Sequence, residues 1–357
     1  MKLFKELLIS VAIVAVFFLL MGLVLPSHRH LTESVETNRN PTITFDFLNG
    51  FRRFKDWNAV SMRDPAAKLT LSGPETGVGS MVSYDSSVRE VGKGSWKITG
   101  LQQDSRIDYA IVNSSMGGNK KSTITLTPSE NGRSVEIKQV YDVDYGMNLI
   151  GRYAGMYVSS YEGEDMKMGL RKLSSLLSDI PNLPYNKMMV PLSPPKVVAM
   201  PAEGVLTISS GTVAQDESAI YVSVKQNDEW IKRVMDANGL EPVGPFRVVT
   251  SDSNSANYAY DLQQVVRKKG ATTGAGLTGV TTQGPVKFQT IPARKAVMTS
   301  VSATDYNSLE LTRGALRAWT LVHGYDISDR PFDVYKSGVD KSFTAGGADF
   351  DVYWPVK

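Results

Sequence analysis

The chain holds few of the residue types that perform covalent or metal chemistry. It contains no cysteine, and its three histidines stand at positions 28, 30 and 323. The lack of cysteine excludes disulfides, thiolate nucleophiles and Cys-based zinc sites. Three histidines leave little from which to build a Ser-His-Asp triad or a multi-His metal site. The sequence therefore predicts no catalytic residue of these kinds, no metal site and no cofactor.

The chemistry that remains is that of carboxylates beside tyrosines. The closing stretch DFDVYW alternates, so in a strand Asp351 and Tyr353 share one face while Phe350 and Trp354 share the other. Asp351 with Tyr353 or Tyr335 could supply an acid and a base if burial raised the carboxyl pKa. A hydrolase or cyclase using Asp351 is thus one hypothesis. The scarcity of catalytic residue types favours a binding protein over an enzyme.

Length and composition indicate a globular chain of more than one domain. The 357 residues include 42% hydrophobic and 21% charged positions, enough to bury two cores of ordinary size. The net charge is +3, and the basic residues are dispersed. This charge is too small and too scattered to predict a nucleic-acid partner.

The first residues predict a membrane segment. Residues 7–25 carry no charge and are mostly apolar, and as a helix they would extend about 28 Å, close to the thickness of a bilayer core. No small-residue cleavage pattern follows them, which favours an uncleaved anchor over a removed signal peptide. Lys2 and Lys5 place the N-terminus inside, although Arg29 lies just beyond the apolar run. We therefore expect residues 1–26 to be a single-pass anchor in the inner membrane, with the rest outside the cytoplasm, in the periplasm of a Gram-negative cell.

Residues 27–180 read as a sheet followed by a long helix. After an opening strand and a short helical pair, six alternating runs separated by turn residues predict an antiparallel meander. The region ends on an apolar stripe at helical spacing, formed by Met166, Leu170, Leu173, Leu177 and Ile180. A bent sheet around such a helix leaves a hollow between them.

Four motifs in this region resemble the START/Bet v 1-like superfamily, also called SRPBCC or polyketide-cyclase-like proteins. They are FDFLNGFRRFKDWN, GPETGVGSMVSYDSS, VGKGSWKITG and GLRKLSSLL, in this order. The resemblance implies a helix-grip fold with an internal apolar pocket and no particular reaction. Candidate lining residues are Tyr84, Trp96, Tyr109 and Tyr153. The alternative, that these aromatic residues fill an ordinary core, stays open.

Residues 181–201 are rich in proline, which removes backbone donors and fixes φ. We expect an extended linker between two domains here.

Residues 202–357 contain a repeated sequence motif, Gly, a short polar loop, Pro-Phe and an apolar strand. GLEPVGPFRVV begins at Gly239 and GYDISDRPFDVY at Gly324. Each half reads strand, helix, Gly loop, strand, strand. The expected first strand and helix of the first half are residues 218–225 and 228–240, and the expected first strand of the second half is residues 294–302. Two such units predict a pseudo-twofold α+β domain with a central cleft.

This order resembles the GyrI-like, or AraC-type effector-binding, domain. The match includes the two Gly…Pro-Phe segments and the closing FDVYWPVK. The family implies an aromatic-lined cleft with one carboxylate for cationic or polar small molecules; its usual Glu falls on Asp351, one methylene shorter. Aromatic faces attract cations. Candidate ligand-binding residues are Trp230, Tyr260, Trp319, Tyr335, Asp351 and Tyr353, against the alternative that the aromatic residues form a core. No helix-turn-helix accompanies this domain, which argues against a transcription factor.

The sequence thus predicts an α+β protein with a transmembrane helix, a helix-grip domain and an effector-binding-like domain. The function it favours is an extracytoplasmic, membrane-anchored protein that senses, sequesters or transfers a small apolar, amphipathic or cationic molecule. The alternatives are the Asp351 enzyme and a structural envelope protein with vestigial pockets. Ligand identity and protein partners are left open.

Overall fold

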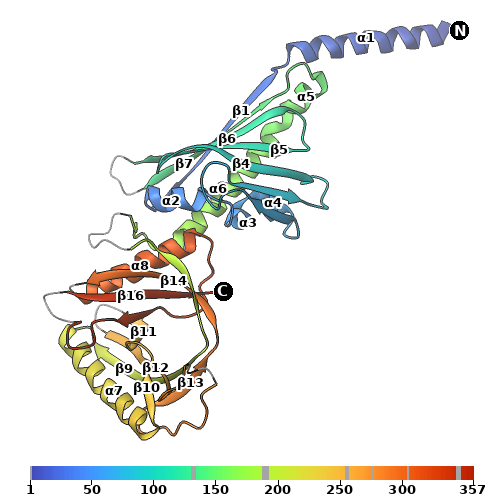
Figure 1. The fold of residues 1–357 in the computed structure, drawn as a ribbon. Coiled ribbons are helices and arrows are strands. Elements are labelled where there is room, and N and C mark those ends of the chain that lie inside the picture. The colour runs from blue at the N-terminus through green and yellow to red at the C-terminus, as the bar shows by residue number, and fades with distance from the viewer. Residues whose placement is uncertain are drawn as a thin grey trace. The chain divides into compact units, whose positions relative to one another are not determined.

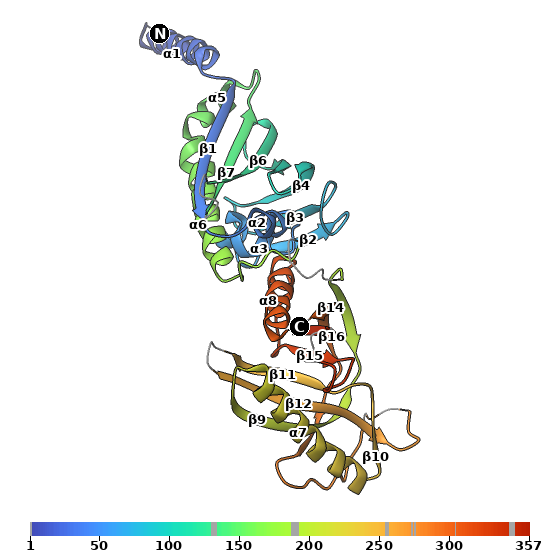
Figure 2. The ribbon, with the colours of Figure 1, turned by 90° about the vertical axis from the view of Figure 1, so that its left-hand side faces the viewer.

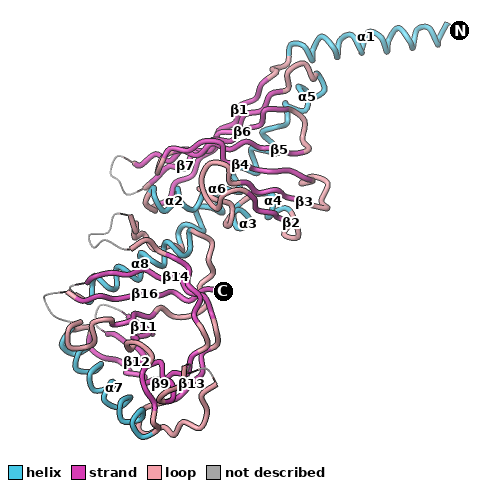
Figure 3. Tube along the Cα trace, viewed as in Figure 1, coloured by secondary structure: helices cyan, strands magenta, loops and turns pink. Residues whose placement is uncertain are grey.

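The computed structural model describes residues 2–129, 134–186, 193–253, 257–272, 274, 276–303, 305–342 and 347–357. The chain divides into two compact units, Met1–Asn182 and Leu183–Lys357. Each unit is built on its own antiparallel sheet, drawn in magenta in Figure 3. The predicted α+β class, with an apolar N-terminal helix ahead of two sheet domains, is confirmed.

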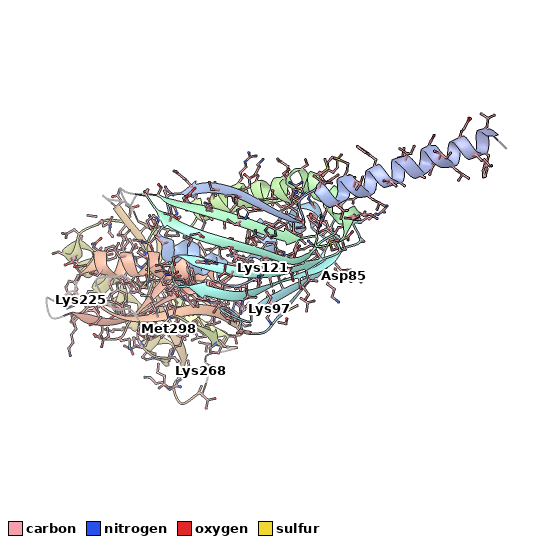
Figure 4. All side chains as sticks on the ribbon, turned by 90° about the horizontal axis from the view of Figure 1, so that it is seen from above. Asp85, Lys97, Lys121, Lys225, Lys268 and Met298 are labelled. Atoms are coloured by element: carbon pink, nitrogen blue, oxygen red, sulfur yellow. The ribbon has the colours of Figure 1, made fainter. Side chains whose placement is uncertain are left out.

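The first helix, α1 (Lys2–Val24), is long and apolar enough to cross a membrane, and almost none of it is buried. Figure 4 shows its side chains projecting into open space along most of its length. A soluble core helix of this composition would be covered by other elements. A membrane anchor or a signal sequence remains as the explanation of α1.

Unit 1 is a seven-stranded antiparallel sheet gripping a helix (Figures 1 and 2). The strand order is β1-β7-β6-β5-β4-β3-β2. Its strands are β1 (His28–Thr37), β2 (Lys68–Ser72), β3 (Met81–Asp85), β4 (Lys93–Gln102), β5 (Arg106–Asn113), β6 (Gly118–Pro128) and β7 (Val135–Asp144). Its further helices are α2 (Pro41–Leu48), α3 (Phe54–Trp57), α4 (Ala59–Arg63), α5 (Leu149–Ala154) and α6 (Glu164–Ser178).

The helix α6 packs on the sheet through the stripe expected from the sequence. Met166, Leu170, Leu173 and Leu177 are buried, and Ile180 is buried just past the end of the helix. A 3₁₀ turn, Gly155–Tyr157, and one turn of π-helix, Ser159–Gly163, join α5 to α6. The chain therefore runs as a nearly continuous helical segment from Leu149 to Ser178, with two irregular turns in its middle.

Unit 2 places eight strands along one antiparallel path, in the order β13-β9-β12-β11-β15-β16-β14-β8, and β10 pairs with β12. Its strands are β8 (Lys196–Met200), β9 (Glu203–Ala214), β10 (Leu240–Pro242), β11 (Arg247–Ser253), β12 (Asn257–Lys268), β13 (Lys287–Ile291), β14 (Arg294–Ala303), β15 (Phe332–Tyr335) and β16 (Ala348–Val356). Its helices are α7 (Glu217–Ala237) and α8 (Tyr306–Val322), and both contribute to one core cluster.

The strand order has the twofold character that the repeat predicted. Reading outward from the central β11–β15 pair gives β11, β12, β9, β13 on one side and β15, β16, β14, β8 on the other. The edge strands are exchanged: β8 precedes the first half but pairs with β14, and β13 precedes the second half but pairs with β9. This exchange ties the two halves into one sheet.

The predicted strand over residues 218–225 is wrong. Ile220, Val222 and Val224 alternate in sequence, but the segment is the start of α7, with Ile220 and Val224 buried and Val222 48% exposed. Asp216 caps the helix by accepting from the Ala219 N–H at 3.0 Å. The first strand of this half is β9 instead. The predicted end of the helix holds, since Gly239 follows it at φ +62°.

Only part of the proline-rich segment 181–201 serves as a linker, because its last residues form a strand of the unit 2 sheet. Residues 187–192, with Pro191, lie outside the described residues. Beyond them, Lys196–Met200 forms the edge strand β8, between Pro195 and Pro201. Prolines on either side of an edge strand are compatible with pairing, because they remove no donor from the ladder itself.

A buried ion pair connects α8 to the centre of the sheet in unit 2. Arg313 Nε donates to Asp333 Oδ2 at 2.8 Å, and Arg313 Nη1 donates to the Tyr306 hydroxyl at 3.0 Å. The side chains of Arg313 and Asp333 are 5% and 0% exposed. Burial disfavours the charge on Arg313, yet the attraction of Asp333 holds the pKa of the guanidinium above its ordinary value. Burial also raises the pKa of Asp333, against the attraction of Arg313, so each charge depends on the presence of the other partner.

We predict that Arg313→Met lowers the free energy of unfolding of unit 2 by about 3–5 kcal/mol, because the Asp333 carboxylate stays buried without its partner. Urea unfolding followed by tryptophan fluorescence measures this, since the Trp354 indole donates to the Arg313 carbonyl at 2.8 Å. The matched control is Arg330→Met, whose partner Asp261 lies 2.7 Å away but whose own side chain is 44% exposed. The control should cost no more than about 1 kcal/mol. Equal losses for both variants would contradict the prediction.

Candidate functional site

A cavity of about 300 Å³ lies inside unit 1, between the sheet and the helices that cover it. Its apolar lining comes from Trp57, Val60, Val91, Trp96, Ile111 and Met166. Its polar lining comes from Tyr84, Asn113, Gln139, Tyr141 and Glu162. Exposed residues of the β3–β4 and β5–β6 connections, Arg89, Glu90, Ser114 and Ser115, also line it and mark its opening to solvent. The hollow expected from the helix-grip pattern is therefore present.

Strand alternation aims the sheet residues into this cavity. Tyr84 on β3, Trp96 on β4 and Ile111 on β5 come from neighbouring strands, with Trp96 paired to Ile111. Gly94, the partner of Tyr84, makes room for the phenol, since a Cβ there would lie 2.4 Å from the Tyr84 hydroxyl oxygen. The missing side chain at Gly94 thus decides where the Tyr84 hydroxyl lies.

Glu162 is the acidic group held inside unit 1 at this cavity. It belongs to the π-helical turn Ser159–Gly163, which widens the helix just before α6 begins. Turns of this kind are rare and occur frequently at functional sites. Burial raises the pKa of Glu162, and the negative charge of Asp165 raises it further. The positive charges of Lys120 and Arg63 and a hydrogen bond from Asn113 act in the opposite direction.

Lys120 lies near Glu162 and is held by Asn113 and Ser115. The Lys120 ammonium donates to the Asn113 side-chain oxygen, to the Ser115 hydroxyl at 2.8 Å and to the Ser115 carbonyl at 2.5 Å. The Asn113 side chain also favours the charged form of Glu162, which lowers the pKa of that carboxyl group. Burial lowers the pKa of Lys120, while Glu162 raises it. Burial disfavours the charged forms of Glu162, which lines the cavity, and of Lys120, which lies near it, and each charge supports the other.

The two tyrosines of the polar lining remain neutral hydroxyl groups. Burial raises the pKa of Tyr84 to about 12, with a further contribution from the charge of Glu162. Burial and Glu162 also raise the pKa of Tyr141. Neutral phenols donate and accept hydrogen bonds, so Tyr84 and Tyr141 offer polar contacts to a bound molecule without adding charge.

A rim contact holds α4 against the start of α6. Arg63 Nε donates to Asp165 Oδ1 at 2.7 Å, and both residues line the cavity. The pair is partly exposed, so its contribution to stability is small. Its effect on the site is to place one positive and one negative charge at the cavity wall, near Glu162.

Of the four residues expected to line the first pocket, the structure places two in the lining. Tyr84 and Trp96 line the cavity. Tyr109 lies behind Trp96, with ring centroids 5.6 Å apart, and its hydroxyl donates to the Leu48 carbonyl at 3.0 Å, so it belongs to the core. Tyr153 packs on α1 instead, where its ring stacks on Phe18 at 4.1 Å.

The residues expected to line the second pocket are spread over both faces of the unit 2 sheet. Tyr260 and Tyr335 are 1% and 0% exposed and belong to the core under α7 and α8. Trp319 packs against that core and stacks on His323 at 4.0 Å. Trp230 is 37% exposed on α7, with the Arg233 guanidinium 5.0 Å from its ring.

Asp351 and Tyr353 share the opposite face of that sheet, since Phe350 and Val352 enter the core. Tyr335 is therefore on the other face from Asp351, which removes one of the two partners considered for an Asp351 enzyme. Asp351 Oδ1 accepts from the Ser300 hydroxyl at 2.6 Å and lies 3.4 Å from the Lys336 ammonium. The Asp351 carboxylate is thus already in contact with a hydroxyl group and an ammonium group of the protein.

Arginines occupy the aromatic surface beside Tyr353. Tyr353 stacks on Phe332 at 4.7 Å, and the guanidinium carbons of Arg247 and Arg294 lie 4.8 and 5.6 Å from the centre of the Phe332 ring. Arg247 is buried and bonds Glu203 and Gln263, each at 2.9 Å. A cationic ligand was expected at this cleft, but the chain's own cations take the cation–π positions at Phe332.

Several residues at the cavity were not singled out from the sequence: Asn113, Gln139, Tyr141 and Glu162, which line it, and Lys120, which contacts Asn113. Three of them carry a signal in the sequence. Gln139 and Tyr141 alternate in phase with Ile137 on β7, so they were inward positions. Glu162 stands four residues before Met166 and so extends the apolar stripe of α6 with an acid. An acidic residue on a buried stripe is an indicator of a functional position.

Comparisons with known proteins give likeness in structure only. No protein-family model matches the chain, and no curated protein matches it. Among solved structures, the EcmrR C-terminal domain has a TM-score of 0.38 at 20% identity, covering 48% of this chain and 99% of that one. A norcoclaurine synthase point mutant from Thalictrum flavum, in complex with a transition-state analogue, has a TM-score of 0.34 at 13% identity, covering 43% and 95%. A protein from Arthrobacter aurescens has a TM-score of 0.32 at 15% identity, covering 43% and 88%.

Likeness at this level says nothing about ligands. What the molecule binds has to be inferred from its own residues.

We predict that Glu162→Gln flattens the dependence of stability on pH. The ordinary pKa of a glutamate side chain is 4.5, and burial raises it in the folded protein. Between these two values the folded state binds more protons than the unfolded state, so stability falls as pH rises, by up to about 1.4 kcal/mol per pH unit. Glutamine has no proton to lose, so the variant gains stability relative to the parent as pH rises above 4.5.

The measurement is urea unfolding of parent and variant at intervals from pH 4 to pH 8. The matched control is Glu164→Gln, two residues along the chain with a side chain 60% exposed, which should leave the slope unchanged. Parallel curves for the parent and Glu162→Gln would show that Glu162 is not held in a protonated form by burial.

Proposed function

We propose that this protein is a membrane-anchored receptor for small amphipathic molecules that carry a basic nitrogen. The observation that supports this is the cavity of unit 1, in which aromatic and aliphatic side chains lie beside charged ones, among them the half-buried carboxyl group of Glu162. Concave, mostly apolar sites with a few convergent polar groups are the usual form of small-molecule sites. The cavity volume of about 300 Å³ suits a ligand of one or two fused rings.

The cationic end of the ligand is inferred from Glu162. Its carboxylate form is disfavoured by burial. The charges of Lys120 and Arg63 favour that form, but Lys120 donates to Asn113 and Ser115, and Arg63 is paired with Asp165. A ligand ammonium beside Glu162 would add a charge-assisted hydrogen bond where the protein supplies little compensation. Trp57 and Trp96 would contact the apolar body of the same ligand, and the phenol oxygens of Tyr84 and Tyr141 would accept further hydrogen bonds from it.

The anchor is the second part of the proposal. Lys2 and Lys5 precede the apolar run of α1, and both soluble units follow it. By the distribution of basic residues, the N-terminus stays in the cytoplasm and the two units lie outside, in the periplasm of a Gram-negative cell. A tethered receptor of this kind would sequester, sense or transfer its ligand at the membrane. A second pocket in unit 2 stays a prediction, and a cation there would compete with Arg247 and Arg294 for Phe332.

The ligand class is tested with three naphthalenes of the same size. Full-length protein in lipid nanodiscs is titrated calorimetrically with 2-(1-naphthyl)ethylamine, 2-(1-naphthyl)ethanol and 1-naphthylacetate. We expect the amine to bind tightest and the carboxylate weakest. Glu162→Gln should weaken the amine about tenfold or more, because a charge-assisted bond is lost, and should leave the alcohol nearly unchanged. Glu164→Gln is the control. Tightest binding of the carboxylate, or no binding of any of the three, would contradict the proposal.

The anchor is tested by mass and by flotation. We expect protein purified from membranes to have the intact mass of the full chain, with residues 1–26 retained, and to float with lipid vesicles on a density gradient. A chain of residues 27–357 should remain at the bottom of the same gradient. Recovery of a chain cleaved near residue 26 would identify α1 as a signal peptide and remove the anchor.

A further inference from the structure

The end of α1 is docked on α5. Arg152, which is 8% exposed, donates through Nη1 to the carbonyls of Gly22, Leu23 and Leu25, at 3.3, 2.9 and 3.2 Å. These are carbonyl groups at the C-terminus of α1, which have no partner within the helix, and a positive charge there also complements the helix dipole. The position of α1 relative to α5 is thus held by specific contacts.

The contact extends along the last turns of α1. The Tyr153 hydroxyl donates to the Phe18 carbonyl at 2.7 Å, and its ring stacks on the Phe18 ring with an interplanar angle of 10°. Gly22 allows this approach, since a Cβ there would lie 3.1 Å from the Leu149 Cβ. The two helices lie side by side at this point in both Figure 1 and Figure 2.

This docking fixes the depth of α5 relative to any bilayer that α1 crosses. The 23 residues of α1 extend about 34 Å, and a hydrocarbon core is about 30 Å thick. Phe18 lies about 9 Å before the end of α1. With α1 across the membrane, Tyr153 and Leu149 lie at the level of its last turns, which is the boundary between acyl chains and headgroups.

The outward side of α5 and the turn after it is apolar. Ile150, Tyr157 and Tyr161 are 63%, 61% and 67% exposed, and with Ala154 they follow one another at spacings of four, three and four residues. Met147 and Met156 beside them are 75% and 50% exposed. We name these exposed residues, Met147, Ile150, Met156, Tyr157 and Tyr161, the α5 patch.

Charge is missing where a soluble protein would carry it. From Met147 to Tyr161 the one charged residue is Arg152, which is buried against the end of α1. Charges resume with Glu162, which is turned into the cavity, and Glu164, which is exposed. The solvent face of a surface helix normally holds charged and polar residues, and a run of exposed apolar residues marks an interaction surface.

We propose that the α5 patch is a membrane-interface surface that lies in the bilayer beside α1, with Ile150 and Met147 in the acyl boundary and Tyr157 at the headgroup level. The proposal rests on the retained anchor of the proposed function. Lipid is the occupant that the geometry selects, because the patch is continuous with α1 and lies at its exit from the membrane. Tyrosine at the headgroup level and apolar side chains below it is the usual arrangement at such interfaces.

The lack of cysteine makes a clean test possible. Single variants Met147→Cys, Ile150→Cys and Tyr157→Cys of the full chain are spin-labelled and reconstituted in vesicles of phosphatidylcholine and phosphatidylglycerol. Power saturation then compares the collision of each label with oxygen, which partitions into acyl chains, and with a water-soluble nickel chelate. Val16→Cys in α1 is the reference for a label in the bilayer core. Val112→Cys on β5 and Leu71→Cys on β2, 65% and 52% exposed in unit 1, are the references for labels in water.

We expect the labels at positions 147 and 150 to collide with oxygen severalfold more than with the chelate, and the label at 157 to be intermediate. The labels at 112 and 71 should show the reverse. If the three patch labels match position 112 while position 16 reports acyl chains, the anchor stands and the membrane-interface proposal is overturned; the patch is then a surface for a protein partner. If position 16 itself is aqueous, the anchor has failed and the proposal fails with it.

Discussion

The partial burial of one carboxyl group, that of Glu162, is the constraint on which the chemistry of the unit 1 cavity depends. A carboxylate enclosed by protein loses its hydration, and the protein must compensate with charges and hydrogen bonds or hold the group protonated. Here the compensation is partial. Lys120 is turned toward Asn113 and Ser115, and Arg63 is turned toward Asp165. A hydrogen-bond donor on a ligand would therefore stabilise the charged form of Glu162, which the protein itself stabilises only in part.

The structure places Glu162 in this situation through backbone geometry. The helical run that begins at Leu149 contains a 3₁₀ turn and a π turn before α6, and Glu162 sits in the second of them. An irregular turn costs hydrogen-bond quality and persists when its surroundings determine it. The same run contacts α1 at one end, through Arg152 and Tyr153, and closes the cavity at the other, through Met166. One helical segment therefore runs from the contact with α1 to the cavity within unit 1.

Unit 2 shows how a duplicated pattern becomes a single sheet. The exchanged edge strands β8 and β13 mean that neither half completes its own sheet, so the halves fold around each other. Polar groups are buried on both faces of this sheet, with Arg313 and Asp333 on the helix side and Arg247, Glu203 and Gln263 on the other. Buried ions require their partners, so these two networks constrain which strands lie next to each other.

The sequence by itself determined the elements whose patterns are long and unambiguous. Helices and strands were predicted correctly for the apolar run of α1, the alternating strands of unit 1, the stripe of α6 and the repeated Gly…Pro-Phe motif. Periodicity indicates which side chains are buried, and therefore which element forms. The sequence pattern predicted the wrong element at residues 218–225, because Ile220, Val222 and Val224 alternate as the apolar residues of a strand do. Helical packing against the sheet instead buries Ile220 and Val224 together with Ile231 and leaves Val222 outside.

Tertiary structure alone decided which residues form the site. The aromatic residues chosen from the sequence divide between the cavity wall, the two cores and the contact with α1, because a strand pattern tells which residues share a face and not what covers that face. Whether an inward side chain fills a core or lines a hollow depends on the volume of the element opposite it. Tyr84 has room for its phenol because Gly94 is its partner on the neighbouring strand, and Glu162 lies in a widened turn of helix. The strand pairing and the widened turn are properties of the folded chain.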